Sequence, residues 1–421
     1  MPRSGAVTLQ PMSHDVPSLS LAEYTYVLPD DRIAQHPLAE RDASKLLVVD
    51  VSTGSVRHEV FRDVAALLPA NSLIIANRSK VIAARLPMVK PTGGSVEVLL
   101  SKPVAPSADP SITLAAASPT RWEALASGRN VVPGTELRHA SMPLTATIVE
   151  RNGADAVVDV AWEGNMTMAE VLDAVGVLPL PPYMRRDATR DDRDRYQTVY
   201  ATEQGSVAAP TAGLHFTERV RTSLNEHGVS WSEVTLHVGL GTFKPVDVED
   251  ARHHVMHSER IAISRQTVEA ILQQHAGPMP WITAVGTTSM RTLESWFAVG
   301  CQLHLGGHLE ETIVVDQWSA FDQRHASVSC GDAFSALAQA MDARGTSVLW
   351  AETQLMLAPG AHIAVCDGLI TNFHQPDSTL LLLVAAFCNG ALWKDAYQQA
   401  LDNDYRFLSY GDAMLLRRTV M

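Results

Sequence analysis

Cysteine is scarce in this chain, and no pair of cysteines has the spacing of a metal site. The 421 residues include four cysteines, which lie far apart at positions 301, 330, 366 and 388. The absence of a Cys-x-x-Cys pair excludes a zinc knuckle, and the wide spacing is not that of a disulfide framework. We therefore predict reduced, mostly buried thiols in a cytoplasmic protein.

Long apolar runs are also missing. The longest, 380–387, is too short to cross a bilayer, and the first 20 residues lack the apolar core of a signal peptide. We expect no membrane partner and a disordered lead-in over residues 1–20. A monomer is favoured, although the sequence leaves oligomerisation open.

Positive charge is in deficit. The formal net charge of −13 argues against a protein coated in positive charge for non-specific binding to nucleic acids. A local basic patch would still be enough to bind an RNA. The hydrophobic and charged contents, 46% and 19%, are ordinary for a globular protein, and the length suits two or three domains.

Common cofactor motifs are absent too. Gly239-Leu240-Gly241 is not a dinucleotide fingerprint, because Lys244 stands where the third glycine is required, and no Walker A pattern occurs. His253 and His257 have the spacing of a metal pair but lack the glutamate of His-Glu-x-x-His. We expect a polar or substrate-facing loop there, with no metal and no permanently bound cofactor.

The pattern of apolar residues and turns changes along the chain. Between about 86 and 165, short apolar runs alternate with turns such as Asn152-Gly153, which predicts a small barrel or sandwich. Elsewhere strands alternate with helices, which predicts a mostly parallel sheet with covering helices. The expected fold class is α/β, with a large mixed α/β domain (21–85 and 166–421) and an inserted small all-β barrel domain (86–165).

Individual elements follow from local periodicity and capping residues. The region 300–345 shows no clean period and is left without elements. The predicted strands are 45–51, 73–76, 96–100, 112–116, 145–149, 156–160, 234–238, 282–285 and 363–370. The predicted helices are 168–175, one from Thr217 to Gly228, 266–275, 289–297 and 378–387.

Four predicted strand ends carry polar loops, at 208–216, 237–243, 285–288 and 371–376. In a parallel sheet such ends lie along one edge, where α/β proteins bind ligands. The first loop has small residues from Pro210 to Gly213 that would let a ligand approach closely. A tight turn without a ligand has the same local pattern.

The third loop begins a helix. Gly286-Thr287-Thr288 would offer free N–H groups and two hydroxyls, which suits a carboxylate or a phosphate. Ordinary capping of a helix by threonine explains the same residues.

Two further segments allow two interpretations each. Five arginines and four aspartates within 185–195 indicate either a self-paired, solvated surface or a phosphate-contacting loop for RNA. The segment 405–412 combines two tyrosines, a phenylalanine, an arginine and an aspartate, which could stack a base or anchor the core.

Taken together, these segments resemble the S-adenosylmethionine:tRNA ribosyltransferase-isomerases of queuosine biosynthesis. The similarity extends over nearly the whole chain from Leu21 onward. It is carried by 32–37 with Arg41-Asp42, 80–86, 93–100, 178–183, 196–220, 235–243, His254 with 256–259, 284–294, 367–379 and 405–414.

The resemblance implies a reaction. The ribosyl moiety of S-adenosylmethionine is transferred to 7-aminomethyl-7-deazaguanine at the tRNA wobble position and isomerised, which gives epoxyqueuosine-tRNA and releases adenine and methionine. S-adenosylmethionine is then a co-substrate, and the anticodon region of tRNA is the partner. Such chemistry needs a base beside the sulfonium, an acid for the departing adenine, and donors for the methionine carboxylate.

The loops and the resemblance together nominate site residues. The catalytic candidates, with base and acid unassigned, are His215, His237, His374, Asp412 and Tyr410. The candidates for binding S-adenosylmethionine are Pro210, Thr211, Gly213, Gly286, Thr287, Thr288 and Asn372. The candidates for binding tRNA are Arg85, Arg186, Arg195, Arg291 and Arg406, of which Arg85 and Arg291 also suit the methionine carboxylate.

Some positions depart from the family pattern. Asn77-Arg78-Ser79-Lys80 stands where members typically read Asn-Asn-Thr-Arg/Lys, Ala83 replaces a proline, and 300–345 is longer and divergent. Two alternatives therefore stay open: a divergent paralogue that uses the same donor on another acceptor, and a non-catalytic tRNA-binding relative. The retained histidines and the 405–412 segment argue against the second.

Overall fold

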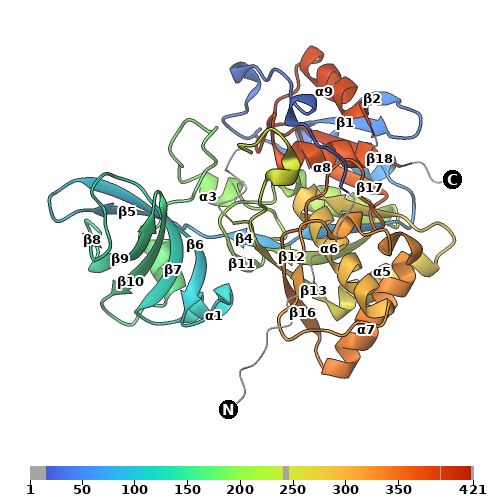
Figure 1. The fold of residues 1–421 in the computed structure, drawn as a ribbon. Coiled ribbons are helices and arrows are strands. Elements are labelled where there is room, and N and C mark those ends of the chain that lie inside the picture. Colours follow the sequence, from blue (N-terminus) through green and yellow to red (C-terminus); the bar gives the residue numbers. More distant parts are fainter. Residues whose placement is uncertain (1–15, 240–245, 389, 419–421) are drawn as a thin grey trace.

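The computed structural model describes residues 16–239, 246–388 and 390–418. A ten-stranded mixed sheet forms the centre of a large α/β unit, and a closed barrel lies to one side of it (Figure 1). The mixed α/β class expected from the sequence is confirmed. In sheet order, the strands are β15 (Val314–Val315), β16 (Val348–Thr353), β13 (Glu259–Ser264), β12 (Ser230–Leu236), β3 (Leu73–Asn77), β14 (Ile282–Val285), β17 (Gly368–Asn372), β18 (Ala413–Arg417), β1 (Lys45–Asp50) and β2 (Val56–Val60).

The four central strands are parallel. Leu73 in β3 pairs with Ser230 on one side and with Ile282 on the other, and Val285 in β14 pairs with Ile370 in β17. The carboxyl ends of β12, β3, β14 and β17 therefore lie along one edge of the sheet. The sheet as a whole is mixed: β15–β16 and β1–β18 are further parallel pairs, whereas β2, β13 and β18 add antiparallel pairs.

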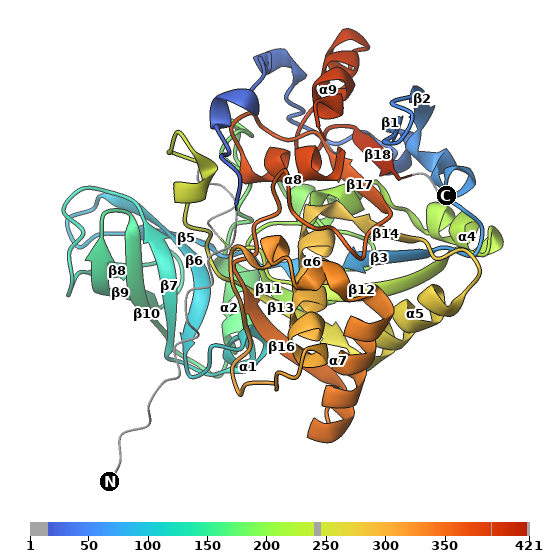
Figure 2. The same ribbon diagram turned by 45° about the vertical axis from the view of Figure 1, so that its right-hand side comes forward.

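Side chains of the central strands alternate between two cores. Ile74 faces the core that contains Phe61 and Phe216, whereas Ile75 faces the core that contains Trp296. One face is covered by α4 (Glu218–Glu226) and the 3-10 helix η4 (Phe61–Leu67), and the other by α5 (Arg265–Ala276), α6 (Gly286–His304), α7 (Cys330–Arg344), α8 (Thr379–Cys388) and α9 (Leu392–Asp402). Figure 2 shows α5, α6 and α7 gathered on one side of the sheet.

The barrel has its own core. Its strands, in the order β10-β7-β6-β5-β8-β9, close around Trp122, and α2 (Met168–Val175) adds Leu172 to the same cluster. The predicted Asn152-Gly153 turn joins β9 to β10, with Gly153 at φ 62°. The barrel strands are β5 (Arg85–Val89), β6 (Ser95–Ala105), β7 (Thr120–Ala126), β8 (Glu136–Arg138), β9 (Leu144–Asn152) and β10 (Asp155–Trp162).

Two predicted strands differ from the structure. Residues 112–116 were expected as a strand but belong largely to α1 (Pro110–Ala115), because the Asp109 side chain accepts the Ser111 N–H and proline occupies the first helical position. The predicted strand 363–370 begins only at Gly368. The N–H groups of 364–366 are bonded instead to the Glu294 carboxylate.

The region without predicted elements contains the end of α6 and the whole of α7, which Ser329 caps and Gly345 ends in the left-handed conformation. The remaining elements are short: β4 (Ser79–Val81), β11 (Glu203–Ser206), α3 (Asp192–Arg195), and the 3-10 helices η1 (Leu21–Glu23), η2 (Asp30–Arg32), η3 (Arg41–Ala43), η5 (Thr211–His215), η7 (Ala251–His253), η8 (Ser319–Phe321) and η9 (His325–Ser327).

The described chain makes contacts before Leu21. Leu19 is 1% exposed, and its N–H donates to Asp250, which also forms a bridge with Ser20. Most of the predicted lead-in, residues 1–15, lies outside the described residues.

In the part of the chain that the structure describes, no single helix has the length and apolar content to cross a membrane. The sharply bent pair α8 and α9 meets those criteria only when the two helices are taken together.

Candidate functional site

A cavity of about 530 Å³ lies at the carboxyl edge of the central strands. This volume is within the usual range for a site that binds a small molecule. Three of the predicted loops line it, through 208–212, 286–288 and 371–376. The fourth predicted loop contributes Val238, while its residues Leu240 to Phe243 lie outside the described residues.

The amino end of α6 opens into this cavity. Gly286 has φ +85°, a conformation that favours glycine, and Thr287 and Thr288 line the wall. The capping interpretation is not what the structure has, because the N-cap residue is Val285, which makes no capping bond. The hydroxyl of Thr288 is buried and has no partner. Free first-turn N–H groups and this hydroxyl form a polar, electropositive end.

A second helix, α8, also begins at the cavity. Ser378, Thr379 and Leu380 line it, and the Ser378 hydroxyl accepts the N–H of Leu381. Two helix amino ends therefore face the same space, which favours an anionic group on a ligand.

Asn372 ends β17 and is 1% exposed. Its side-chain amide donates to Nε2 of His215 at 3.1 Å and to the carbonyl oxygen of Asp412 at 3.3 Å. Its side-chain oxygen is buried and has no partner. This oxygen and the Thr288 hydroxyl are two polar atoms of cavity-lining residues that have no protein partner. Buried polar atoms are normally hydrogen-bonded, and a polar ligand that bonds to these two would supply the missing partners.

His374 is the only catalytic candidate from the sequence that lines this cavity. Its Nε2 lies 2.8 Å from the hydroxyl of Thr371, which in turn donates to the carbonyl oxygen of Asn372 at 3.2 Å. With that hydroxyl proton used, Nε2 carries a hydrogen and Nδ1 carries the lone pair. Burial lowers the pKa of His374 to about 4, so the imidazole is neutral at pH 7.

His215 lies behind the wall rather than on it. Its Nδ1 lies 2.8 Å from the Ser44 hydroxyl, its Nε2 accepts from Asn372, and its ring packs 5.0 Å from that of Phe61. Burial, assisted by the positive charge of Arg406, lowers the pKa of His215 to about 4. The structure thus places this histidine as a neutral, fully bonded group in contact with a cavity residue.

His237 faces a different space, a second cavity of about 630 Å³ between the barrel and β12–β13. Its ring stacks on Trp350 at 6.1 Å, and its Nδ1 is buried without a partner. Burial and then the charge of Arg260 lower the pKa of His237 to about 4. The two cavities share the wall formed by Val238, His257 and Glu259.

Asp412 and Tyr410 do not line the first cavity. The Asp412 carboxylate accepts the backbone N–H groups of Lys45 and Arg406, at 3.0 and 2.8 Å. The Tyr410 hydroxyl donates to Asp192 at 2.9 Å, and burial raises its pKa further from neutrality. Both side chains hold loops together in this structure.

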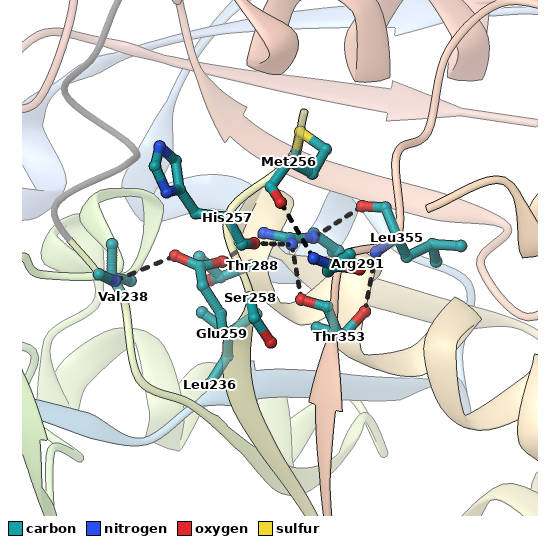
Figure 3. Close-up of polar contacts among 12 residues, drawn as sticks. Leu236, Val238, Met256, His257, Ser258, Glu259, Thr288, Arg291, Thr353 and Leu355 are labelled. Atoms are coloured by element: carbon teal, nitrogen blue, oxygen red, sulfur yellow. Dashed lines mark hydrogen bonds and ion pairs between the residues drawn. The ribbon is translucent and has the colours of Figure 1, made fainter. Parts of the chain in front are cut away.

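Arg291 lines the cavity, but its donors are used by the protein (Figure 3). The guanidinium donates to the carbonyl oxygens of Leu355 at 2.8 Å and Thr353 at 3.1 Å, and it forms an ion pair with Glu259. The other oxygen of Glu259 accepts the N–H of Gly239 at 3.0 Å. This network ties α6 to β13 and β16 and leaves little donor capacity for a ligand.

The other predicted tRNA contacts lie outside the cavity and have protein partners as well. Arg186 makes a two-point ion pair with Asp192, at 2.7 and 2.8 Å. Arg195 donates to the carbonyl oxygens of Leu38 and Ala39. Of the remaining two, Arg85 lies 3.6 Å from Glu97, and Arg406 donates to the His36 carbonyl oxygen at 3.4 Å.

The predicted small-residue loop divides into two parts. Pro210 and Thr211 line the cavity, whereas Gly213 does not. A Cβ at Gly213 would lie 2.1 Å from the Tyr200 hydroxyl, so this glycine permits close packing within the protein.

The loop around His253 and His257, expected to be polar or substrate-facing, supplies His254, Met256 and His257 to the cavity wall, although none of these three was nominated as a site residue. The rule used to find loops looked for strand ends, but this segment precedes β13. Because β13 runs antiparallel to β12, its amino end lies beside the carboxyl end of β12. The signal available was the family resemblance over His254 and 256–259. Among the described residues, no three His, Cys, Asp or Glu side chains are grouped to hold a metal ion.

The similarity to known proteins extends over most of the chain. A family model described as queuosine biosynthesis protein matches residues 21–416. The S-adenosylmethionine:tRNA ribosyltransferase-isomerase of Nitratidesulfovibrio vulgaris (strain DP4) is 41% identical over 411 residues, which covers 94% of this chain and 97% of the relative. The protein of that name from Azoarcus sp. (strain BH72) is 40% identical over 404 residues, with 95% and 98% covered.

Among solved structures, the chain matches the crystal structure of S-adenosylmethionine tRNA ribosyltransferase from Thermotoga maritima. The two are 27% identical with a TM-score of 0.45, and the match covers 94% of this chain and 99% of that one.

Proposed function

The chain belongs to the queuosine biosynthesis family, and on that premise we propose that it is an S-adenosylmethionine-dependent tRNA ribosyltransferase-isomerase. It transfers the ribosyl moiety of S-adenosylmethionine to 7-aminomethyl-7-deazaguanine at the tRNA wobble position and isomerises it. The products are epoxyqueuosine-tRNA, adenine and methionine. The observation that carries this proposal is the cavity where two helix amino ends, Asn372 and His374 meet in a chain related to these enzymes along its length.

The cavity suits S-adenosylmethionine as a co-substrate. The methionine carboxylate binds at the amino end of α6, where Thr288 has an unpartnered hydroxyl and the first-turn N–H groups are free. Pro210 and Thr211 supply a wall without charge. Gly286 lets the chain turn into the helix with its first-turn amides at the wall.

His374 is the base that removes the proton beside the sulfonium. Its Nδ1 accepts that proton, and Thr371 stabilises the opposite nitrogen as a donor. The other catalytic candidates act away from the reacting atoms, as positioning groups. This assignment rests on two observations: only His374 among them lines the cavity, and it is neutral at pH 7.

The tRNA binds across the mouth of the cavity. The self-paired arginines of 185–195 support an indirect role for Arg186 and Arg195, in which they hold the loop against which the RNA lies. Arg85 and Arg406 are partly exposed and supply positive charge to the RNA backbone.

The proposal extends to organisation. Residues 86–165 form a β-barrel domain inserted in a discontinuous catalytic domain, 21–85 and 166–421. The barrel has a hydrophobic cluster of its own, which supports a separate domain there, and Leu172 of α2 packs into that cluster from beyond residue 165. As an enzyme that acts on tRNA, the protein works in the cytoplasm, as a monomer.

The test is incubation of the protein with S-adenosylmethionine and tRNA that carries the deazaguanine precursor, followed by mass analysis of the tRNA. Adenine and methionine should appear only when this tRNA is present, in proportion to epoxyqueuosine formed. No adenine above background with intact precursor-bearing tRNA would refute the proposal. Turnover only with another RNA would select the divergent paralogue, and tight tRNA binding without S-adenosylmethionine binding would select the non-catalytic relative.

A further inference from the structure

A buried polar chain leads from the core to the cavity wall. The Ser44 hydroxyl lies 2.8 Å from Nδ1 of His215, and Nε2 of His215 lies 3.1 Å from the side-chain nitrogen of Asn372. The three residues are 1%, 4% and 1% exposed. Ser44 follows the 3-10 helix η3, His215 ends η5 and Asn372 ends β17, and the tertiary fold brings these segments together although they are far apart in sequence.

The direction of these hydrogen bonds is fixed by Asp412. Its carbonyl oxygen can only accept a hydrogen bond, so the group of Asn372 that lies 3.3 Å away must be the amide nitrogen. The same nitrogen faces His215, whose Nε2 must then carry a lone pair. The ring hydrogen is therefore on Nδ1, from which it is donated to Ser44.

This direction leaves the side-chain oxygen of Asn372, a residue that lines the cavity, buried and without a hydrogen bond. A buried carbonyl oxygen without a donor is unfavourable, and among the described residues none provides one. Asn372 carries no charge, and the carboxylate of Glu259 in the same cavity is already paired with Arg291. An amide oxygen requires a hydrogen-bond donor and no charge, so a neutral N–H or O–H group of a ligand would complete it.

We propose that His215 is a positioning residue that holds the Asn372 amide so that its oxygen accepts a hydrogen bond from a neutral donor of the bound ligand. With S-adenosylmethionine as the ligand, an identification that rests on the proposed function, that donor is a ribose hydroxyl or the exocyclic amine of adenine. His215 touches no reacting atom in this arrangement and acts through Asn372.

The first experiment measures binding by calorimetry without tRNA. S-adenosylmethionine and its analogues lacking the 2′-hydroxyl, the 3′-hydroxyl or the adenine amine are titrated into the wild type and into Asn372→Leu. The substitution should weaken binding of the parent compound about tenfold. One analogue lacks the group that bonds to Asn372, and the substitution should change the binding of that analogue by less than twofold. The group missing from that analogue is then the donor. Equal weakening of the parent and all analogues would overturn the proposal.

The second experiment tests the positioning role by nitrogen NMR of the wild-type protein with labelled histidine. The His215 signals should show a neutral ring with its hydrogen on Nδ1 at pH 7, whereas a hydrogen on Nε2 would overturn the proposal. His215→Ala identifies the signals, and Ser44→Ala should raise KM for S-adenosylmethionine several-fold with kcat within twofold. A Ser44→Ala protein that loses kcat instead, with KM unchanged, contradicts a positioning role.

The two proposals fail in different ways. Discrimination among the analogues without any turnover of precursor-bearing tRNA would refute the enzyme assignment and keep the role of His215. Turnover of that tRNA, together with equal weakening of all compounds by Asn372→Leu, would keep the enzyme assignment and refute the role of His215.

Discussion

Two polar regions of this protein were both candidates for ligand binding in the sequence, and they differ in how far the structure satisfies their polar groups. The cavity wall, made by 286–288 and 371–374, keeps an amide oxygen and a hydroxyl without protein partners. The connector 185–195 has many more charges, yet most of its arginines are bonded to carboxylates and carbonyl groups of the protein itself. Capacity to bind a ligand thus follows from unsatisfied groups and not from the density of charge.

The largest effect should come from the wall. Replacing His374 with glutamine removes the proposed base, and kcat should fall by roughly 10²- to 10⁴-fold, the usual contribution of general base catalysis. Release of adenine from S-adenosylmethionine measures it. The matched control is His275→Gln, a half-buried histidine of α5 outside both cavities, which should stay within twofold of wild type. A loss of less than tenfold for His374→Gln would remove this residue from the chemistry.

A substitution in the connector should change the stability of the protein rather than catalysis. Asp192→Ala leaves the guanidinium of Arg186 and the hydroxyl of Tyr410 without their shared carboxylate, and it should lower the free energy of unfolding by about 3 kcal/mol. Burial opposes ionisation of Asp192, but bonds from Arg186 and Thr189 outweigh it and hold its pKa well below the usual range.

Urea denaturation measures this effect, with the exposed Asp187→Ala as the control, which should lie within 0.5 kcal/mol of wild type, as surface substitutions usually do. Wild-type stability for Asp192→Ala together with a loss of tRNA turnover would show that the connector acts directly on the RNA, and the contrast between the two regions would fail.

Acid should lower the free energy of unfolding, because three buried histidines at or near the two cavities resist protonation in the folded protein. In the folded protein the pKa of each of His215, His237 and His374 is lowered to about 4, against an ordinary value of about 6.5. Between those values the unfolded chain takes up protons that the folded protein refuses, so stability is complete above pH 6.5 and falls as the pH is lowered. At pH 5 the loss should be on the order of 1–2 kcal/mol for each histidine.

Urea denaturation at pH 7 and pH 5 checks this dependence. His237→Phe, which removes one of the three titrating groups, should reduce the difference in unfolding free energy between the two pH values. The same difference in the variant and the wild type would show that His237 does not contribute in this pH window.

The amino end of α6 should affect binding of the donor substrate. Thr288→Val removes a hydroxyl that has no protein partner, so the fold should lose little. If the hydroxyl binds the methionine carboxylate, KM for S-adenosylmethionine should rise about fivefold, which corresponds to about 1 kcal/mol, with kcat unchanged. Thr222→Val, on the exposed side of α4, is the control. An unchanged KM would move the carboxylate to another site, of which the start of α8 is the next.

The smallest effect should come from Arg190, the connector arginine whose side chain makes no hydrogen bond or ion pair among the described residues, although its carbonyl oxygen accepts the N–H of Arg193. Arg190→Ala should raise KM for tRNA by less than threefold, since one exposed charge is screened by salt. The comparison is sharpened by repeating the measurement at low and high salt. A rise of more than tenfold that disappears at high salt would make the connector a phosphate contact.

The sequence predicted elements where local signals agree. The helix 168–175 and the strand 282–285 have the predicted bounds, because a Thr167 cap with Glu170 and a run of buried β-formers act within a few residues. The strand expected at 112–116 is helical because Asp109 and Pro110 act as helix-start signals. The strand expected at 363–367 is absent because a carboxylate more than 60 residues away takes its N–H groups, which no local pattern encodes.

The candidate site shows the same limit. The convergence of the loops at 208–212, 286–288 and 371–376 follows from one rule about parallel strands, and the structure brings these loops together. The sequence nominated His215, His237 and His374 equally as catalytic candidates. The orientation of the 3-10 turn η5 and of the end of β12 decides that only His374 lines the first cavity. The residues at 254–257 were not nominated for the site, because antiparallel pairing brings this segment to that edge from the other end of a strand.

The sequence by itself determined the fold class and the edge of the sheet where ligands bind, because strand periodicity, helix caps and small-residue loops act locally. The family came from the resemblance of its motifs along the chain. Only the tertiary structure decided which polar atoms remain without partners. Asn372 and Thr288 line the cavity and each keeps a buried polar atom without a protein partner, whereas the guanidinium groups of Arg186 and Arg291 are bonded within the protein. Whether a polar group finds a hydrogen-bond partner depends on residues that are distant in sequence, so only the folded structure shows it.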